Sequence, residues 1–230
     1  MNDILYFKKV IENLGNNPID LLKKSLITYN QELARESINK IISDRIEPAI
    51  ALEAITETMR LVGDAFARDE LFLPDLFSAA DTMQLIMPII EKEIEKKGGK
   101  RKILGKIVLG TVSGDIHSIG KTMVGTLLSA SGFKVYDLGI DVTSKKFMEA
   151  IRKYKPDMLA MSALLTTTAY EQKNVIGMLK KEGLRKKVKI IVGGGAVTEE
   201  FAGSIGADGY GSTAPGAATL AKKILGIKGD

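Results

Sequence analysis

The sequence predicts an all-α helical bundle followed by an α/β domain with a flavodoxin-like (Rossmann-like) five-stranded parallel sheet. Two observations predict this order. Up to about Glu95 the apolar residues recur at the spacing of amphipathic helices, whereas after about residue 103 short apolar runs alternate with helix-length amphipathic segments. We therefore expect a helical bundle over residues 1–97, a linker over 98–102 and an α/β domain over 103–230.

The helical half has its clearest pattern in the run IEPAIALEAITETMRLVGDAF, residues 46–66. Pro74 suits the first turn of the next helix, and Pro88 should kink or interrupt that helix. Four or five helices fit in this half of the chain. The apolar residues of the run share one broad helical face, which is made of Ile46, Ile50, Ile55, Met59, Val62 and Phe66.

The second half contains five apolar runs of strand length. Because helical patterns separate them, we expect a parallel sheet with helices on both faces and strand order 2-1-3-4-5. Ligands of such sheets bind at the carboxyl ends of the strands, beside the switch in strand order. The loops expected there are 113–120, 162–168 and 193–198. The five runs are KIVLGTV (106–112), FKVYDLG (133–139), DMLAMSAL (157–164), VKIIVGG (188–194) and ADGYG (207–211).

Composition excludes several classes of function. The chain has no cysteine, so disulfides, iron–sulfur clusters and thiol nucleophiles are absent. The net charge of +5 comes largely from two basic clusters, Lys96–Lys102 and Leu184–Lys189, and neither is interleaved with aromatic residues. We therefore expect no nucleic-acid partner. No apolar run is long enough to span a bilayer, so we expect a cytoplasmic protein with no membrane partner.

His117 is the only histidine of the chain, and it lies in GDIHSIGKTMVG, residues 114–125, where a strand gives way to a helix. A phosphate-binding P-loop is disfavoured because the first glycine of that pattern would fall on Asp115, whose carboxylate repels phosphate. A hydrolytic triad with Ser162 is disfavoured because that serine lacks the Gly-x-Ser-x-Gly context.

Two interpretations of His117 remain open. It is either a structural histidine that hydrogen-bonds locally, or a single axial ligand to a metal whose macrocycle supplies the other ligands. In the second case Asp115 would accept the proton of the other imidazole nitrogen and raise the basicity of the ligand. Ser162 would in turn hold the carboxylate of Asp115.

Three motifs occur in order along the second half: Asp115-x-His117-x-x-Gly120, Ser162-x-Leu164 and Gly193-Gly194. The gaps between them are 41 and 28 residues. Together they resemble the signature of cobalamin-binding domains in methionine synthase, cobalamin-dependent mutases and methyltransferase corrinoid proteins. The likeness departs from the pattern at Ser118, where an acidic residue is common, and at Gly195, where alanine is frequent.

The helical half resembles the cap module of methionine synthase and of the small corrinoid proteins of methyl transfer. The segment VGDAFARDELFLPDLFSAADTM, residues 62–83, carries this likeness. Phe66, Leu73 and Leu76 match positions that shield the reactive face of the corrin. Their alternative role is the core of the bundle.

The resemblance implies a bound cobalamin, a cobalt corrinoid, in the base-off, His-on state. His117 would be the axial ligand to cobalt, and Asp115 and Ser162 would complete the ligand triad. Further residues are implied at the cofactor: Gly114, Ile116, Ser118, Ile119, Gly120, Leu164, Thr166, Val192, Gly193, Gly194, Gly195, Tyr210, Gly211 and Ala214.

The implied function is that of a corrinoid methyl carrier, which is not catalytic alone. Co(I) would accept a methyl group from a substrate-specific methyltransferase. Methyl-Co(III) would then pass it to a second methyltransferase with a tetrahydrofolate or thiol acceptor. A reductive activation protein is a further implied partner. The methyl donor depends on the partner enzyme, and methanol, methylamines, methoxylated aromatics and betaines are all open.

The alternative is a cobalamin-binding sensor or regulatory protein. Such proteins usually carry a DNA-binding or signalling segment as well. Residues 19–42 show a plain helical pattern with no convincing recognition helix. The carrier is therefore the preferred interpretation.

Overall fold

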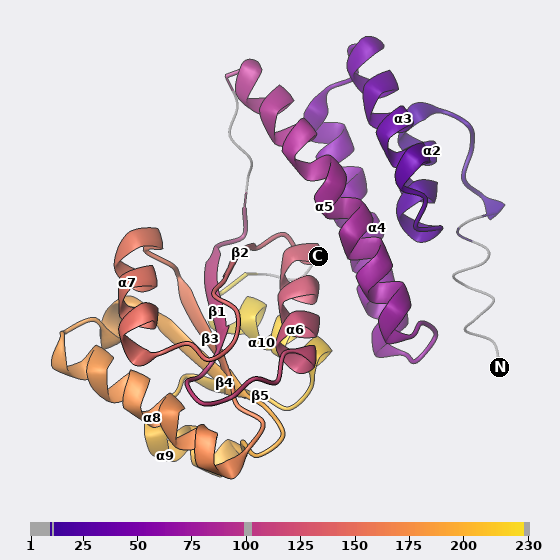
Figure 1. Ribbon diagram of the computed structural model, residues 1–230. Coiled ribbons are helices and arrows are strands. Elements are labelled where there is room, and N and C mark those ends of the chain that lie inside the picture. The colour runs from indigo at the N-terminus through magenta and orange to yellow at the C-terminus, as the bar shows by residue number, and fades with distance from the viewer. Residues whose placement is uncertain (1–9, 11, 99–102, 228–230) are drawn as a thin grey trace. The chain divides into compact units, whose positions relative to one another are not determined.

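The computed structural model describes residue 10 and residues 12–98 and 103–227. The chain forms two compact units that divide between residues 102 and 103. Most of the expected linker, residues 99–102, lies outside the described residues. Figure 1 shows a helical first unit and a second unit in which helices flank a sheet.

The first unit contains four helices within the described residues: α2 (Pro18–Ile27), α3 (Gln31–Ser43), α4 (Pro48–Ala67) and α5 (Leu73–Lys96). Asn17 and Asn30 begin α2 and α3, and each side chain accepts hydrogen bonds from backbone N–H groups of the first turn. The helices bury a shared core that includes Leu22, Leu26 and Ile38.

The predicted face of α4 is mostly correct. Ile55, Met59 and Val62 are buried, but Ile50 is 49% exposed in the first turn of the helix. The expected interruption at Pro88 is wrong, because α5 continues through this residue to Lys96. Pro88 is exposed, so its ring displaces no core side chain.

The second unit has five parallel strands in the order β2-β1-β3-β4-β5, which confirms the predicted topology. Helices α6 and α10 cover one face of the sheet, and α7, α8 and α9 cover the other (Figure 1). The elements follow one another as β1 (Lys106–Thr111), α6 (Ile119–Ala130), β2 (Lys134–Asp137), α7 (Ser144–Tyr154), β3 (Met158–Ser162), α8 (Thr166–Lys181), the 3-10 turn Arg185–Lys187, β4 (Lys189–Gly193), α9 (Glu199–Ile205), β5 (Gly209–Gly211) and α10 (Ala214–Ile224).

The register of the sheet brings three strand ends side by side. Thr111 at the end of β1 pairs with Ser162 of β3, and Ser162 pairs with Gly193 of β4. The loops that follow these strands therefore emerge together at the carboxyl edge of the sheet. In the part of the chain that the structure describes, no helix combines the length and apolarity needed to cross a membrane.

Candidate cofactor site

His117 lies in the loop between β1 and α6, and its backbone is fixed on both sides. Its N–H donates to Oδ1 of Asp115 at 3.0 Å, and its carbonyl accepts from the buried hydroxyl of Thr111 at 3.0 Å. Nδ1 of the imidazole lies 2.8 Å from the same Oδ1. The side chain is 48% exposed, so Nε2, which takes no part in this contact, is open to a ligand.

Asp115 is buried, with 1% of its surface exposed, and every contact of its carboxylate favours the ionised form. Oδ2 accepts from the backbone N–H of Leu164 at 2.7 Å and from the hydroxyl of Thr168 at 2.7 Å. Burial alone would raise the pKa of Asp115. The hydrogen bonds from Thr168, His117 and Leu164 outweigh burial and hold that pKa well below its usual value. Asp115 therefore presents a fixed negative charge to Nδ1 of His117.

Ser162 lies elsewhere than expected. The hydroxyl that donates to Asp115 belongs to Thr168, in the first turn of α8, whereas Ser162 lines a cavity beside the end of β3. Residues 162 and 168 both belong to the loop and helix start that follow β3. The choice between them depends on how that loop turns, which the sequence pattern does not specify.

The loop that follows β2, an edge strand of the sheet, hydrogen-bonds to the turn that contains His117. Oδ1 of Asp141 accepts from the N–H of Gly114 at 2.7 Å, and the N–H of Asp141 donates to the carbonyl of Asp115 at 3.1 Å. Gly114 has a φ of +76°, a left-handed conformation that favours glycine. Asp141 was absent from the sequence prediction because its partner is 27 residues away.

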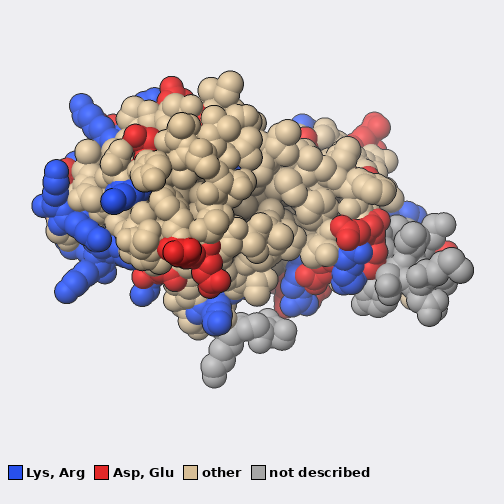
Figure 2. Space-filling view, turned by 90° about the horizontal axis from the view of Figure 1, so that it is seen from below, with Lys and Arg blue, Asp and Glu red and all other residues tan. Residues whose placement is uncertain are grey.

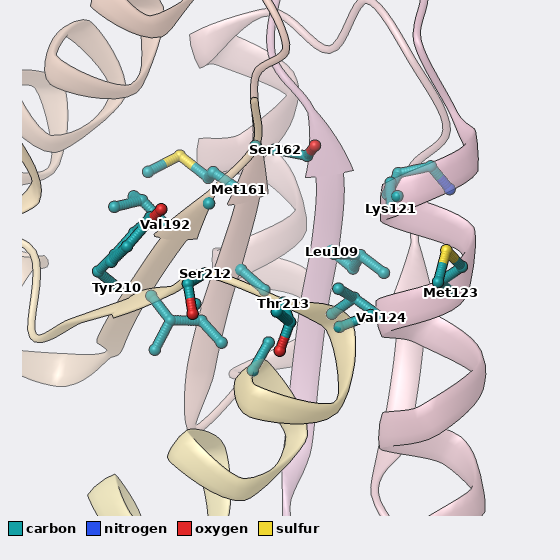
Figure 3. Close-up of a pocket in the computed structure, with 18 of the residues that line it drawn as sticks. Leu109, Lys121, Met123, Val124, Met161, Ser162, Val192, Tyr210, Ser212 and Thr213 are labelled. Atoms are coloured by element: carbon teal, nitrogen blue, oxygen red, sulfur yellow. The ribbon is translucent and has the colours of Figure 1, made fainter. Parts of the chain in front are cut away.

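A cavity of about 310 Å³ opens beside this turn, between the sheet and helices α6 and α10. Figure 3 shows its walls, with Met161 and Ser162 on β3, Tyr210 on β5 and Val124 on α6. Nine of the residues implied at the cofactor line it: Gly120, Ser162, Val192, Gly193, Gly194, Gly195, Tyr210, Gly211 and Ala214. The cavity is also lined by Ser212 and Thr213, which fall within the expected stretch 210–214, and by eight residues that were not predicted: Leu109, Lys121, Met123, Val124, Ala160, Met161, Ile191 and Ala217.

Lys121 contributes only its alkyl chain to the cavity. The residue is buried, and its ammonium forms an ion pair with Asp137 of β2. Figure 3 shows this nitrogen directed away from the cavity. Asp137 also fixes the following turn by accepting from the N–H of Gly139 at 2.8 Å. The Gly-Lys-Thr sequence at residues 120–122 therefore does not offer its ammonium group to a phosphate in the cavity.

Two glycines at the end of β4 are required by close backbone approach. A Cβ on Gly193 would lie 2.7 Å from the carbonyl oxygen of Gly211, and one on Gly194 would lie 1.9 Å from that of Ala163. At Gly195 a Cβ would lie 2.8 Å from a methyl group of Leu164. These glycines thus serve first to pack the sheet and its loops.

Gln172 hydrogen-bonds to the ends of both β3 and β4. This residue of α8 has 0% of its surface exposed, and its Nε2 donates to the carbonyls of Met161 and Gly193, each at 3.2 Å. Gln172 lies one helical turn after Thr168, so one face of α8 contacts the histidine-bearing loop, β3 and β4 together.

The remaining implied residues of this unit are exposed in the loops and helix starts that follow β1 and β3. Gly114, Ser118 and Thr166 are exposed, and three large apolar side chains are exposed in the same segments: Ile116 by 72%, Ile119 by 64% and Leu164 by 42%. Figure 2 views this edge of the sheet and shows mostly uncharged atoms over the α/β unit, with Lys and Arg at its outer margin. An exposed apolar rim around a polar donor is typical of a ligand site.

In the helical unit, Phe66 and Leu73 are partly buried where α4 ends and α5 begins. Leu76 has 0% of its surface exposed and belongs to the bundle core, which is the alternative role that the sequence left open. The structure adds Phe72, which is 73% exposed between the two helices.

The α/β unit fits a cobalamin on two observations. Nδ1 of His117 lies 2.8 Å from a buried carboxylate, and metal-binding imidazoles commonly have such a partner on the nitrogen that does not bind the metal. The exposed apolar rim and the adjoining cavity give space for a flat macrocycle and for an extended tail.

Comparisons with known proteins agree with this chemistry. Two family models described as B12 binding domains match the chain, one over residues 18–91 and the other over residues 105–218. The trimethylamine corrinoid protein of Methanosarcina barkeri is 41% identical over 206 residues, which cover 89% of this chain and 95% of the relative. A corrinoid protein of Desulfitobacterium hafniense is 40% identical over 212 residues, which cover 90% and 97%.

A similar fold occurs in the crystal structure of the methanol:cobalamin methyltransferase complex from Methanosarcina barkeri. The match has a TM-score of 0.86 at 31% identity and covers 97% of this chain and 86% of that chain. Because both B12-binding models and full-length corrinoid relatives match, the chain belongs to the family of corrinoid proteins built from two B12-binding domains.

Proposed function

We propose that the chain is a methyl carrier that binds cobalamin base-off, with Nε2 of His117 as the axial ligand to cobalt. The observation that carries this proposal is the contact between Nδ1 of His117 and the buried, ionised carboxylate of Asp115 at 2.8 Å. This contact fixes the proton on Nδ1, so the lone pair of Nε2 faces the exposed apolar rim.

Each part of the α/β unit then has a defined task. Asp115 holds the proton on Nδ1 and stabilises positive charge on the imidazole when Nε2 is not bound to metal. The cavity between the sheet, α6 and α10 receives the nucleotide tail, with Ser162 and Tyr210 among its walls. Ile116 and Ile119, which are exposed beside His117 in the sequence, would hold the macrocycle by apolar contact and exclude water from it.

When bound, the corrinoid supplies a cobalt centre that can accept a methyl group and give it up again. We assign to Phe66 and Leu73 the shielding of the reactive face, and we add the exposed Phe72 to them. Leu76 supports these residues from within the bundle core. Shielding by apolar side chains protects a reactive centre from water until a partner enzyme approaches.

The proposal requires two partner enzymes. A substrate-specific methyltransferase delivers the methyl group, a second methyltransferase removes it to tetrahydrofolate or a thiol, and a reductive activation protein restores the carrier after oxidation. Relatives named for trimethylamine and a similar structure from a methanol methyltransferase complex favour a small methylated amine or alcohol as donor. We expect the exchange to take place in the cytoplasm.

The test is methyl transfer from protein loaded with methylcobalamin. We expect loss of the cobalt-bound methyl group only when an acceptor methyltransferase and its acceptor, coenzyme M or tetrahydrofolate, are both present. Retention of the methyl group with both acceptor systems, together with binding to DNA that changes with light or cobalamin, would contradict the carrier and indicate the sensor.

A further inference from the structure

The loop between β2 and α7 runs beside the end of β1 and is bound to it by backbone hydrogen bonds. The N–H of Thr111 donates to the carbonyl of Gly139 at 3.0 Å, and the N–H of Val142 donates to the carbonyl of Thr111 at 2.9 Å. Val142 also forms a parallel bridge with Val112. The backbone is therefore fixed on both sides of Asp141.

Asp141 makes three hydrogen bonds to the turn that contains His117. Its Oδ1 accepts from the N–H of Gly114 at 2.7 Å and from the hydroxyl of Ser113 at 3.3 Å. Its own N–H donates to the carbonyl of Asp115 at 3.1 Å. The bond from Gly114 has the short length that is typical of an ionised acceptor. Asp141 thus binds three consecutive residues, and the last of them carries the carboxylate that faces the imidazole.

Capping of α7 does not account for an aspartate at position 141. Thr143 is the N-cap residue of that helix, and its hydroxyl accepts from the N–H of Lys146 at 3.3 Å. Asp141 has a φ of +50°, in the left-handed region that glycine adopts most readily. Glycine would suit this backbone, so the feature that distinguishes aspartate here is the carboxylate that binds Gly114.

The turn from Gly114 to His117 is anchored at both ends. Asp141 binds its start, and the hydroxyl of Thr111 donates to the carbonyl of His117 at 3.0 Å. Between these anchors, Oδ1 of Asp115 lies 3.0 Å from the backbone nitrogen of His117 and 2.8 Å from Nδ1 of its ring. Both contacts require the chain to fold back within two residues. They therefore depend on the left-handed conformation of Gly114, whose N–H is bound by Asp141.

We propose that Asp141 is a positioning residue that holds this turn in the conformation in which Asp115 faces the imidazole of His117. Its carboxylate acts through the backbone of the turn. The proposal rests on the proposed role of His117 as the axial ligand. It also connects that ligand to α6 through the edge strand, because Asp137 at the end of β2 pairs with the buried ammonium of Lys121.

The single histidine of the chain makes a test possible without cofactor. The nitrogen-15 shifts of the His117 ring in the unloaded protein report which ring nitrogen carries the proton. At a pH about two units above the ordinary imidazole pKa of about 6.5, we expect the Nδ1–H tautomer to dominate in the wild type. Asp141→Gly removes the carboxylate and suits the positive φ. In this variant the ratio of the Nδ1–H to the Nε2–H tautomer should fall by roughly two- to tenfold, as expected for the loss of one hydrogen bond.

Two further variants separate positioning from a general effect on stability. Asp141→Asn keeps an acceptor oxygen on a residue that tolerates the left-handed region, so it should keep most of the wild-type ratio. Lys155→Gly is the matched control, because Lys155 is an exposed residue with a φ of +46° at the other end of α7, and it should leave the ratio unchanged. An unchanged ratio in Asp141→Gly overturns the proposal, as does an equal fall in Asp141→Asn or in Lys155→Gly.

Hydrogen exchange of the wild type tests the proposal even if Asp141→Gly fails to fold. The N–H of Gly114 is bonded to Oδ1 of Asp141, so it should exchange with deuterium at least about threefold more slowly than an unprotected amide. Exchange of this amide at the unprotected rate overturns the proposal.

The absorbance spectrum of the loaded protein distinguishes this proposal from the function on which it rests. After loading with hydroxocobalamin, Asp141→Gly should contain less of the His-on form than Asp141→Asn. If His117→Ala has the same spectrum as the loaded wild type, the proposed function fails. The tautomer ratio in the unloaded protein still decides whether Asp141 positions the imidazole.

Discussion

Gly120 and Gly194 both belong to glycine-rich turns, yet the structure gives them different tasks. Gly194 has a φ of +122°, and a Cβ there would overlap the carbonyl oxygen of Ala163 at 1.9 Å. Gly120 lies in α6 with nothing within 4 Å of an added Cβ. We expect Gly194→Ala to lower the free energy of unfolding by about 2–4 kcal/mol.

Gly120→Ala is the control for that substitution. It should leave the free energy of unfolding within about 1 kcal/mol of the wild type, because alanine is compatible with the helical backbone. Urea denaturation of both variants measures the difference. Equal losses in the two variants would show that the crowding at Gly194 is relieved by movement of its neighbours.

The sequence predicted Asp115 and His117 but not the residues that hydrogen-bond to the loop that contains them. Asp115 and His117 could be predicted because His117 is the only histidine of the chain and both residues belong to the motif Asp115-x-His117-x-x-Gly120. Thr168 and Asp141 could not, since each contacts the loop from a distant part of the chain. The glycines at the end of β4 were predicted as residues that admit a ligand, whereas Gly193 and Gly194 are needed by the backbone itself.

Pro88 in α5 allows the effect of an interior proline on the free energy of unfolding to be measured. Pro88 lies inside the helix, where it cannot donate the backbone hydrogen bond that another residue would supply. Because the residue is exposed, Pro88→Ala should raise the free energy of unfolding by about 1–3 kcal/mol without disturbing the core. Thermal or urea unfolding followed by circular dichroism checks this, and a less stable variant would show that the proline fits a distortion the bundle requires.

Tyr29 couples the turn between α2 and α3 to the first turn of α5. Burial, the negative charge of Asp75 and a hydrogen bond to that carboxylate raise the pKa of Tyr29 to about 12. The unfolded chain releases this proton near the ordinary tyrosine pKa of about 10. The free energy of unfolding should therefore be unaffected by this group below about pH 10 and should fall as pH rises from about 10 to 12.

Tyr29→Phe removes the titrating group and isolates this effect from the lysines that titrate in the same range. Between about pH 10 and 12 the free energy of unfolding of the wild type should fall relative to that of the variant. Urea midpoints at several pH values measure it. A constant difference across that range would mean that Tyr29 ionises equally easily in the folded and unfolded chain.

The elements themselves were predictable to different degrees. The five strands and their order followed from alternating apolar runs, because a parallel sheet leaves few other arrangements. The helical face that contains Ile50 was predicted less accurately, since this residue is exposed in the first turn of α4. Leu76 and Phe72 show the same limit, because the spacing of apolar residues does not reveal which of them the bundle buries.

The molecule consists of two compact units, and the proposed axial ligand and the cavity for the tail both belong to the α/β unit. A ligand that binds the folded form stabilises the unit that holds it. We therefore expect hydroxocobalamin to raise the unfolding temperature of the α/β unit in calorimetry, with a smaller change when His117→Ala is used. Stabilisation of equal size in both proteins would mean that the axial bond contributes nothing to retention.

The central claim is that His117 ligates the cobalt of a bound corrinoid. The most direct measurement is the absorbance spectrum of the protein after incubation with hydroxocobalamin and removal of unbound cofactor by gel filtration, for the wild type and for His117→Ala. We predict that the wild type retains the corrinoid and that its spectrum changes in the variant, because water replaces the imidazole. Retention with identical spectra, or no retention by the wild type, would contradict the account.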